Sequence, residues 1–434
     1  MVARAARQRV AVAMLVALTV AACGGDDGER ASGDGDPVKL VALSDDRRRE
    51  ASTADPAVAA GATLAFGSDL FAAVASGADL SDNVVVSPVS IAIALGMLEP
   101  GATGEARRQL REVLRIEDPD RFHASMNALD RNLEARVAQA FNQGDEPGEV
   151  VVRIANAAYL QQGYPFERAY VDAVSRSYGA VLNAVDFAPD PDAIVAEINR
   201  FVAEATSDRI TDLLGPGSLR AGTVLALVNA LYLKASWLEV FDEAKTREGP
   251  FATSSGSSVT VPMMHGTSAS SARGDGWVAA TKSYVGRLQV QFVLPDEGRF
   301  DEVAADFDEV VAEFDRRRTS GALLVVPRFE VRFSTELGAG LESLGLTAPY
   351  REGHLLGIAD DPLLVLDVAQ HEAFVAMDEH GTEAAAATVL TVYPTSGPPS
   401  PPVPVVLDRP FLFRIFDLET GATLFLGRVV DPTG

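Results

Sequence analysis

Cysteine and histidine are both scarce in this sequence. Its 434 residues include one cysteine, Cys23, and an internal disulfide needs two. The five histidines are His123, His265, His354, His371 and His380. None of them lies in an HExxH pattern, and the GxSxG and GxxxxGKS/T patterns do not occur either. The sequence therefore does not support zinc-protease, acyl-hydrolase or P-loop chemistry, and we expect no catalytic residue, no metal ion and no cofactor.

Positive charge is also in short supply. Lys and Arg number 37 against 61 Asp and Glu, so the formal net charge is −24 at pH 7. A surface of this sign repels phosphate backbones and anionic lipid headgroups. We expect neither a nucleic acid nor a glycosaminoglycan as a partner.

An apolar run lies close to the N-terminus. Residues 10–22 are apolar except for Thr19, follow three arginines, and are too few to span a bilayer. The run ends in VAAC (20–23), which is similar to a bacterial lipobox apart from valine in place of the usual leucine. This pattern predicts a lipoprotein signal peptide over 1–22 and lipidation of Cys23. The alternative is a soluble secreted protein in which Cys23 is incidental.

The residues after Cys23 show no apolar periodicity. Positions 24–56 are rich in Gly, Asp, Ser and Arg, a composition typical of a disordered tether. We expect 23–56 to be a tether from the lipidated cysteine and 57–434 to be one folded domain. The protein would then be anchored at the extracellular face of the cell membrane through its lipid, or be secreted.

Helical and strand-like patterns alternate within 57–434. Helical periodicity appears at 61–76, 89–98, 104–114 and 193–206. Strand-like runs appear at 151–160, 223–233, 288–294, 322–326, 373–377, 411–416 and 423–430. Helices come mostly first and strands dominate later, so we expect an α+β fold. The polar, proline-rich segment 379–408 interrupts the second half, and a loop of that length inside a compact domain is usually functional.

Short motifs spread over the domain occur in an order known from one family. They are NVVVSPVSI at 83–91, NAAY at 156–159, VNALYLKASW at 228–237, PRF at 327–329, LESLG at 341–345 and DRPFLF at 408–413. Together the motifs resemble the serpin family over about residues 57–432. Phe201 stands where the family commonly has tryptophan, and Ala235 stands where it commonly has glycine.

The resemblance implies a fold, an activity and a partner. The fold would consist of helices around three β-sheets with an exposed reactive-centre loop. The activity would be inhibition of a serine protease through a covalent complex, so the protein itself would not be an enzyme. We expect a monomer. The alternative is a non-inhibitory serpin acting as a binding protein or chaperone, although hinges of that class often carry bulky or charged inward-facing residues.

The start of segment 379–408 resembles the hinge of inhibitory serpins. The hinge residues are Glu379, Gly381, Thr382, Glu383, Ala384, Ala385, Ala386, Ala387 and Thr388. In that family the cleaved loop enters the main sheet as a new strand, so every second residue must face the interior. The inward-facing residues would be Thr382, Ala384, Ala386 and Thr388.

All four inward-facing residues are small and uncharged, so burying them costs little free energy. Glu383 has the opposite parity, where its carboxylate could stay in contact with water. Gly381 permits the backbone to swing as the loop enters. An alanine-rich helix or a plain linker is the competing interpretation of this segment.

Counting along the loop places the bond that a protease would cut. Family spacing from Gly381 gives Thr395–Ser396, whereas counting back from the end of the loop gives Pro399–Ser400. We favour Thr395–Ser396, because insertion depends on the length of chain between the hinge and the cut. Val392 and Pro394 before this bond suit an elastase-like or subtilisin-like protease.

A polar cluster beneath the main sheet is also implied by the resemblance. It is the family's shutter, and its members here would be Ser87, Ser90, Asn156 and His371. A hydrogen-bonded core histidine is the plain alternative for His371. None of the four is expected to do chemistry.

Overall fold

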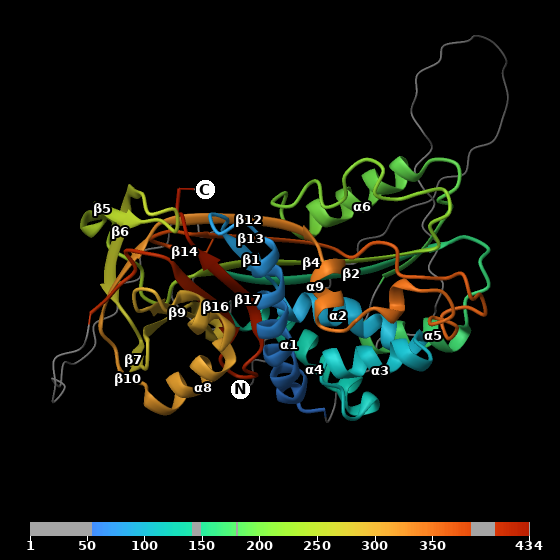
Figure 1. The fold of residues 1–434 in the computed structure, drawn as a ribbon, viewed down its shortest axis with the longest axis horizontal. Helices are drawn as coiled ribbons and strands as arrows, with labels where there is room; N and C mark the ends of the chain where they lie inside the picture. The colour runs from blue at the N-terminus through green and yellow to red at the C-terminus, as the bar shows by residue number, and fades with distance from the viewer. Residues whose placement is uncertain (1–53, 141–148, 179–180, 383–403, 434) are drawn as a thin grey trace, which may run out of the picture. The chain divides into compact units, whose positions relative to one another are not determined.

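The structure is a computed structural model, and it describes residues 54–140, 149–178, 181–382 and 404–433 (Figure 1). The α-helices in these ranges are α1 Pro56–Gly77, α2 Pro88–Leu98, α3 Gly104–Val113, α4 Pro119–Ala140, α5 Arg168–Tyr178, α6 Pro191–Ala205, α7 Phe300–Ala305, α8 Phe307–Arg317 and α9 Gly338–Ser343. Pro56, Pro88 and Pro191 stand in the first turns of their helices, where a missing N–H costs nothing. The Asp or Ser before each proline accepts a hydrogen bond from a backbone N–H of that turn.

The strands form three sheets. The six-stranded sheet has the order β12 Phe329–Glu336, β13 Gln370–Met377, β14 Gly381–Thr382, β4 Leu225–Ser236, β2 Val150–Gln161 and β3 Val181–Val185. The seven-stranded sheet has the order β1 Val84–Val86, β17 Thr423–Val429, β16 Phe411–Asp417, β9 Leu288–Pro295, β8 Trp277–Ser283, β7 Ser270–Gly274 and β10 Thr319–Ser320. The four-stranded sheet has the order β15 Val405–Val406, β11 Leu323–Pro327, β6 Ser258–Thr267 and β5 Arg247–Ala252. Helices around three sheets confirm the predicted α+β fold.

The six-stranded sheet is covered on both faces. Val228 and Ala230 of β4 belong to an apolar cluster that includes Ile198 and Val202 of α6. The intervening residue Leu227 belongs to the main core. Side chains alternate between the two faces of a strand, so α6 covers one face and the main core lies under the other. Figure 1 shows α6 on one side of β2 and β4, with α1, α2 and α4 on the other side.

Helix α1 is long and apolar enough to cross a membrane by length and composition. Phe66, Leu70 and Phe71 of this helix are fully buried in the protein core. The apolar character of α1 is therefore explained by its place in the core.

The six-stranded sheet is incomplete between β13 and β4. Only the two-residue strand β14 lies between them, with Thr382 opposite Met377 on one side and Ala235 on the other. Among the described residues no ladder joins β13 directly to β4 below this point. The two strands still approach each other there. We call this unpaired junction between β13 and β4, from β14 downwards, the gap.

Candidate functional site at the upper end of the gap

Thr382 is the last described residue before the segment 383–403, and it lies inside the sheet. Its exposed fraction is 1%. Its hydroxyl group lies 2.8 Å from the hydroxyl group of Tyr284, which comes from the loop after β8. Thr382 therefore faces the core beneath the sheet, and insertion of the residues that follow it stays a prediction.

Gly381 leaves no space for a side chain. Its φ is +155°, and a Cβ built at this position would lie 2.0 Å from the carbonyl oxygen of Ala235 on β4. The backbone N–H groups of His380 and Gly381 both donate to the carboxylate of Asp378, which shapes the turn into β14. The close approach of β14 to β4 thus requires glycine.

Glu379 is hydrogen-bonded to two residues that are distant in the sequence, Arg328 and Thr246. It is 3% exposed, and its carboxylate accepts hydrogen bonds from Arg328 at 2.7 Å and from the Thr246 hydroxyl at 2.7 Å. Burial alone would raise the pKa of Glu379, but the bonds from Arg328 and Thr246 outweigh it and lower the pKa below its usual value. Glu379 is therefore an ionised anchor for the chain that leads into β14.

Trp237, just after β4, links the hinge to the core beneath it. Its ring stacks on Tyr284 with centroids 4.1 Å apart and planes 11° apart. Its indole N–H donates to the Asp378 carbonyl at 2.9 Å, and its backbone N–H donates to the His380 carbonyl at 2.8 Å. The start of the loop is thus held to β4 by backbone bonds and supported from below by two aromatic rings.

Lys282 of β8 is a buried cation beside the rings of Phe241 and Trp237. Its Nζ lies 4.3 Å from the ring centroid of Phe241 and 5.7 Å from that of Trp237, and it donates to the Thr267 carbonyl at 3.3 Å. Burial lowers the pKa of Lys282 to about 8, with Glu239 opposing the shift. An ammonium group therefore lies under the hinge in surroundings that disfavour its charge.

Two of the predicted shutter residues, Ser87 and Ser90, lie at the start of α2, and a third, His371 of β13, contacts Ser87. Ser87 caps α2 by accepting a hydrogen bond from the Ser90 N–H at 3.4 Å. The backbone N–H of Ser87 donates to Nε2 of His371 at 3.2 Å, so this ring nitrogen carries no proton. Burial lowers the pKa of His371 to about 4. The structure therefore brings Ser87, Ser90 and His371 together, with the histidine neutral.

A cavity of about 40 Å³ lies beneath the gap at the level of these residues. Ile91 of α2, Leu227 and Asn229 of β4, and His371 of β13 contribute to its lining. Such a volume admits about one water molecule or a small apolar group. Asn156 stands opposite Asn229 in the ladder of β2 and β4, and its side chain is outside the described part of the structure.

The remaining predicted site residues fall outside the described ranges. They are hinge residues 383–388, both candidate reactive bonds, Thr395–Ser396 and Pro399–Ser400, and the lipidation residue Cys23. Sequence reasoning in turn did not select Arg328, Tyr284 or Lys282 as site residues. Arg328 lies in the PRF motif and could have been selected from it, whereas Tyr284 and Lys282 come from β8 and the loop after it without any local signal.

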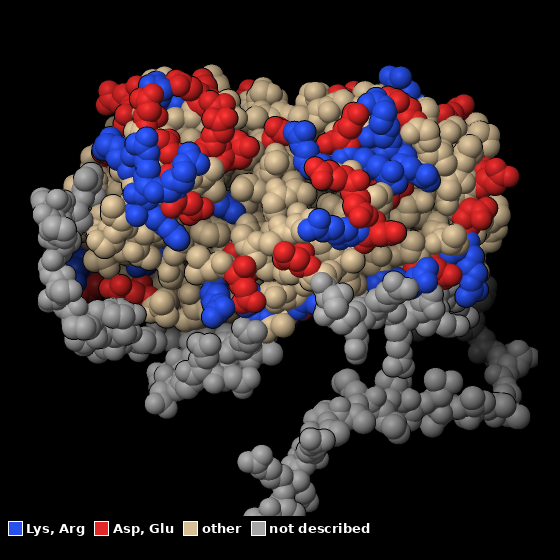
Figure 2. All heavy atoms as spheres, turned by 90° about the horizontal axis from the view of Figure 1, so that it is seen from below, with Lys and Arg blue, Asp and Glu red and all other residues tan. Residues whose placement is uncertain are grey.

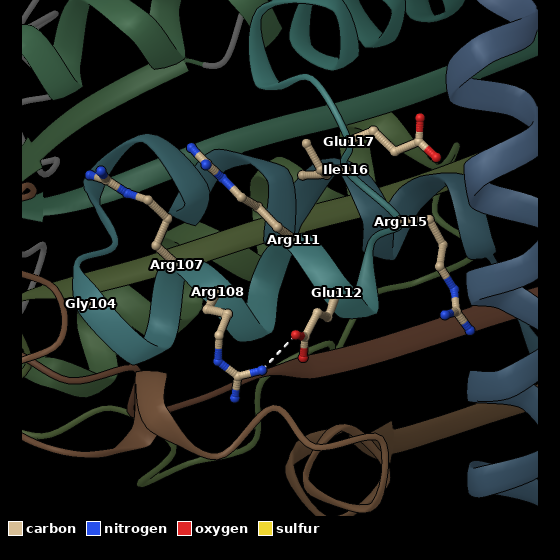
Figure 3. A pocket seen from close by; sticks show the side chains of 8 residues that line it. All are labelled: Gly104, Arg107, Arg108, Arg111, Glu112, Arg115, Ile116 and Glu117. Atoms are coloured by element: carbon tan, nitrogen blue, oxygen red, sulfur yellow. Dashed lines mark hydrogen bonds and ion pairs between the residues drawn. The ribbon is translucent and has the colours of Figure 1, made fainter.

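A surface hollow of about 530 Å³ lies over α3 and is lined by four arginines (Figure 3). Arg108 is paired with two glutamates of its own helix, Arg111 with Glu99, and Arg115 with Asp69. On the face of the molecule seen in Figure 2, basic clusters likewise lie next to acidic ones. Three of the four arginines are thus neutralised by neighbouring acids, and we assign no ligand to this hollow.

Proteins of one known family match most of this chain in sequence. The family described as serpin (serine protease inhibitor) matches residues 61–432. Alpha-1-antiproteinase of Rattus norvegicus is 31% identical over 364 residues, which cover 81% of this chain and 84% of the relative. An uncharacterized serpin-like protein of Thermococcus kodakarensis is 32% identical over 359 residues, which cover 81% of each chain.

Solved structures share the three-sheet fold. The native stressed conformation of a serpin from Arabidopsis has a TM-score of 0.74 and 26% identity, and the match covers 88% of this chain and 100% of that one. Human thyroxine-binding globulin complexed with thyroxine has the same TM-score and identity, with 87% and 100% covered. These proteins are named serpins, inhibitors or a binding globulin rather than enzymes. The chain therefore belongs to the serpin family of protease inhibitors and is not an enzyme.

Proposed function

We propose that this protein inhibits a serine protease by inserting its cleaved loop into the gap between β13 and β4. The observation that carries the proposal is the position of Thr382, which is already paired with both strands and buried. The strand that would fill the gap has thus begun at its upper end. Extension of β14 needs no new fold, only further ladder bonds on both sides.

The register of β14 predicts where each hinge residue would lie. Continuing the pairing from Ala235 and Met377 puts position 384 beside Leu233 and Val375, and position 388 beside Asn229 and His371. Thr388 would then offer its hydroxyl group to the polar shutter residues. Alanine at positions 384 and 386 would face the main core, where a charged residue would be costly to bury.

The same register bears on the reactive bond. Position 392 would lie opposite Leu225, where β4 begins, and position 395 would lie opposite Gly222. Both positions lie past the end of β4, and position 399 lies four residues further past it than position 395 does. This supports Thr395–Ser396 over Pro399–Ser400 as the bond whose cleavage leaves less slack. Val392 and Pro394 support an elastase-like or subtilisin-like target.

The mechanism implied by the family membership is kinetic trapping. The protease serine would attack the carbonyl carbon of Thr395 and form an acyl-enzyme while Ser396 leaves as a new N-terminus. Insertion of the loop would then carry the attached protease along the sheet and distort its active site. Each oxyanion-hole donor that the protease loses slows deacylation by about 10²–10³. The polar shutter residues would let the sheet open without leaving apolar groups exposed.

The proposed anchoring rests on the sequence around Cys23. We propose that the protein is a lipoprotein, tethered by 23–56 to the outer face of the cell membrane. The Cys23→Ser variant should move from the membrane fraction to the soluble fraction in the producing cell. Wild type and variant both in the soluble fraction would support the soluble secreted form, and both in the membrane fraction would show that Cys23 is not the anchor.

Human thyroxine-binding globulin, whose structure this chain matches, supports a second candidate function, that of a non-inhibitory binding protein. The two candidates differ in what a protease does to the loop. An inhibitor forms a covalent complex with the protease, whereas a binding protein is only cleaved.

Mixing the protein with subtilisin and, separately, with elastase tests the proposal. A band at the summed mass on a denaturing gel is the expected result. Cleaved protein without such a band, for both enzymes, would favour the binding protein. The Thr382→Arg variant should lose the covalent band and become a substrate, because an arginine cannot be buried at this position. Thr319→Arg on the exposed strand β10 is the matched control and should inhibit like the wild type.

A further inference from the structure

The connection between α6 and β4 crosses the outer face of the gap. It consists of residues 206–224 and follows a helix that packs on β2 and β4. Its first turn reaches the strands on the other side of the gap, because the carbonyl oxygen of Arg209 accepts a hydrogen bond from Arg332 of β12 at 2.7 Å. The same guanidinium binds the carboxylate of Glu372 on β13 at 2.8 Å. Arg332 therefore fastens the connection to β12 and β13.

A second set of contacts also fastens the connection 206–224 to β13. Phe374 of β13 stands directly opposite Arg332 in the ladder and is 8% exposed. The guanidinium carbon of Arg332 lies 5.2 Å from the ring centroid of Phe374, and that of Arg209 lies 5.6 Å from it. Two cations on one aromatic ring favour this closed position. We call Arg209, Arg332 and Phe374 the latch.

The turn that presents Arg209 is strained. Ser207 and Asp208 have φ of 53° and 61°, in the left-handed region that costs a non-glycine residue about 1 kcal/mol or more. The turn is held by the Asp208 N–H, which donates to the Ala203 carbonyl, and by the Ile210 N–H, which donates to the Thr206 hydroxyl. Two strained residues in a row persist only where neighbouring contacts fix them.

The latch lies across the path of a strand that enters the gap. Phe374 is three residues below Met377 on β13, and the residue at the same level of β4 is Tyr232. Both have the parity of the face covered by α6. A lengthening β14 must therefore pass between Phe374 and Tyr232 within three residues of Thr382, beneath the connection that spans them.

We propose that the latch controls the rate at which a strand enters the gap, an inference that rests on the proposed loop insertion. While Arg332 holds Arg209 against Phe374, β13 and β12 are tied to the α6 side of the sheet. Separation of β13 from β4 breaks these contacts first. The latch thus delays insertion in the intact protein and sets how fast the sheet opens after cleavage.

Annealing of a synthetic peptide tests the latch without a protease. The probe is a peptide with the sequence of residues 382–392, incubated with the intact full-length protein and followed by native gel electrophoresis. The Arg209→Ala variant removes one cation, and Arg332→Lys keeps a charge beside Glu372 but lacks the fork that binds both partners. Phe374→Leu keeps an apolar side chain without the ring. All three should incorporate the peptide about fivefold faster than the wild type.

Arg200→Ala on α6 is the matched control, because within the described part of the chain Arg200 forms its ion pairs with Glu197 and Glu204 of its own helix. Its annealing rate should equal that of the wild type. Equal rates for the wild type and all latch variants would overturn the latch while leaving loop insertion intact. If the peptide enters none of the proteins, the wild type included, the proposed insertion itself fails and the latch fails with it.

Discussion

Single residues at the upper end of the gap determine whether β14 can form. Gly381 is closest to β4, and Thr382 is bonded to Tyr284 in the core. A side chain at position 381 would meet the backbone of Ala235, which cannot move without disturbing the ladder. The contact is set by backbone, so no change of rotamer can relieve it.

The Gly381→Val variant should therefore have its hinge expelled from the sheet. Loss of the Thr382–Tyr284 hydrogen bond and of the β14 ladder should destabilise the folded state by about 1–3 kcal/mol. Limited proteolysis should cut the segment after residue 378 faster than in the wild type. A Gly256→Val variant, at an exposed turn with a left-handed φ and nothing near its Cβ, is the control for backbone strain alone. Equal cleavage of both variants would contradict the account of β14.

His371 predicts a loss of stability in acid. Its pKa is lowered from 6.5 to about 4 in the folded state because the ring is buried. Between these two pH values the unfolded chain binds more protons, so the folded state loses stability as the pH falls from 6.5 towards 4. The loss from this residue should reach roughly 3 kcal/mol. Urea unfolding at several pH values measures it, and a His371→Gln variant should show a smaller slope in this window.

Lys282 predicts a change in stability at alkaline pH. Its pKa is lowered from 10.5 to about 8, so stability should fall as the pH is reduced from 10.5 through 8, where the buried amine gains its charge. The Lys282→Met variant, which fills the same space without a charge, should be more stable than the wild type by about 2 kcal/mol at pH 7. The difference should shrink towards pH 10. A variant less stable than the wild type at pH 7 would show that the contacts with Phe241 and Trp237 outweigh the cost of burying the charge.

Of the four hinge residues predicted to face inwards, Thr382 is the one that lies within the described part of the chain. The alternation of small neutral residues after Gly381 predicts a face that can be buried, and Thr382 has that orientation in the structure. The partners of these residues could not be predicted. Tyr284 and Arg328 are far from Thr382 and Glu379 along the chain, and their contacts depend on the packing of separate sheets.

Among the elements, α4 shows where periodicity fails. Its 22 residues include buried polar side chains such as Asn127, Asp130 and Arg136, so its apolar positions do not form a clean helical pattern. The helix is instead fixed by tertiary contacts. Arg136 is fully buried and binds Asp417 at 3.0 Å and Glu419 at 2.9 Å, which joins α4 to the end of β16. Elements with a continuous apolar stripe, such as α6, were predictable to within a few residues.

Removal of Arg136 should separate α4 from β16. The Arg136→Ala variant leaves Asp417, which is 0% exposed, without its cation, and the expected loss is about 3–5 kcal/mol of folding free energy. Arg108→Ala, which breaks only exposed ion pairs on α3, should change stability by less than about 1 kcal/mol. Thermal unfolding of the two variants measures the difference. Similar melting temperatures would mean that the buried pair contributes nothing to the position of α4.

For the whole molecule, the sequence predicts the family and the location of the loop, since ordered motifs span the domain. It does not predict how much free energy the gap stores. That quantity depends on the ladder bonds that β13 and β4 lack below β14, and on the 40 Å³ cavity beneath them. A strand covering positions 383–392 would add backbone bonds on both sides. At about 1 kcal/mol net for each bond, the gain is on the order of 10 kcal/mol.

Thermal unfolding of the protein before and after a single cut in segment 383–403 tests this account most directly. If the cut loop enters the gap, the nicked protein should unfold at least about 10 °C above the intact protein, because the sheet has gained a central strand. A nicked protein that unfolds at the same temperature as the intact one, or below it, would contradict the proposal that the gap accepts the loop.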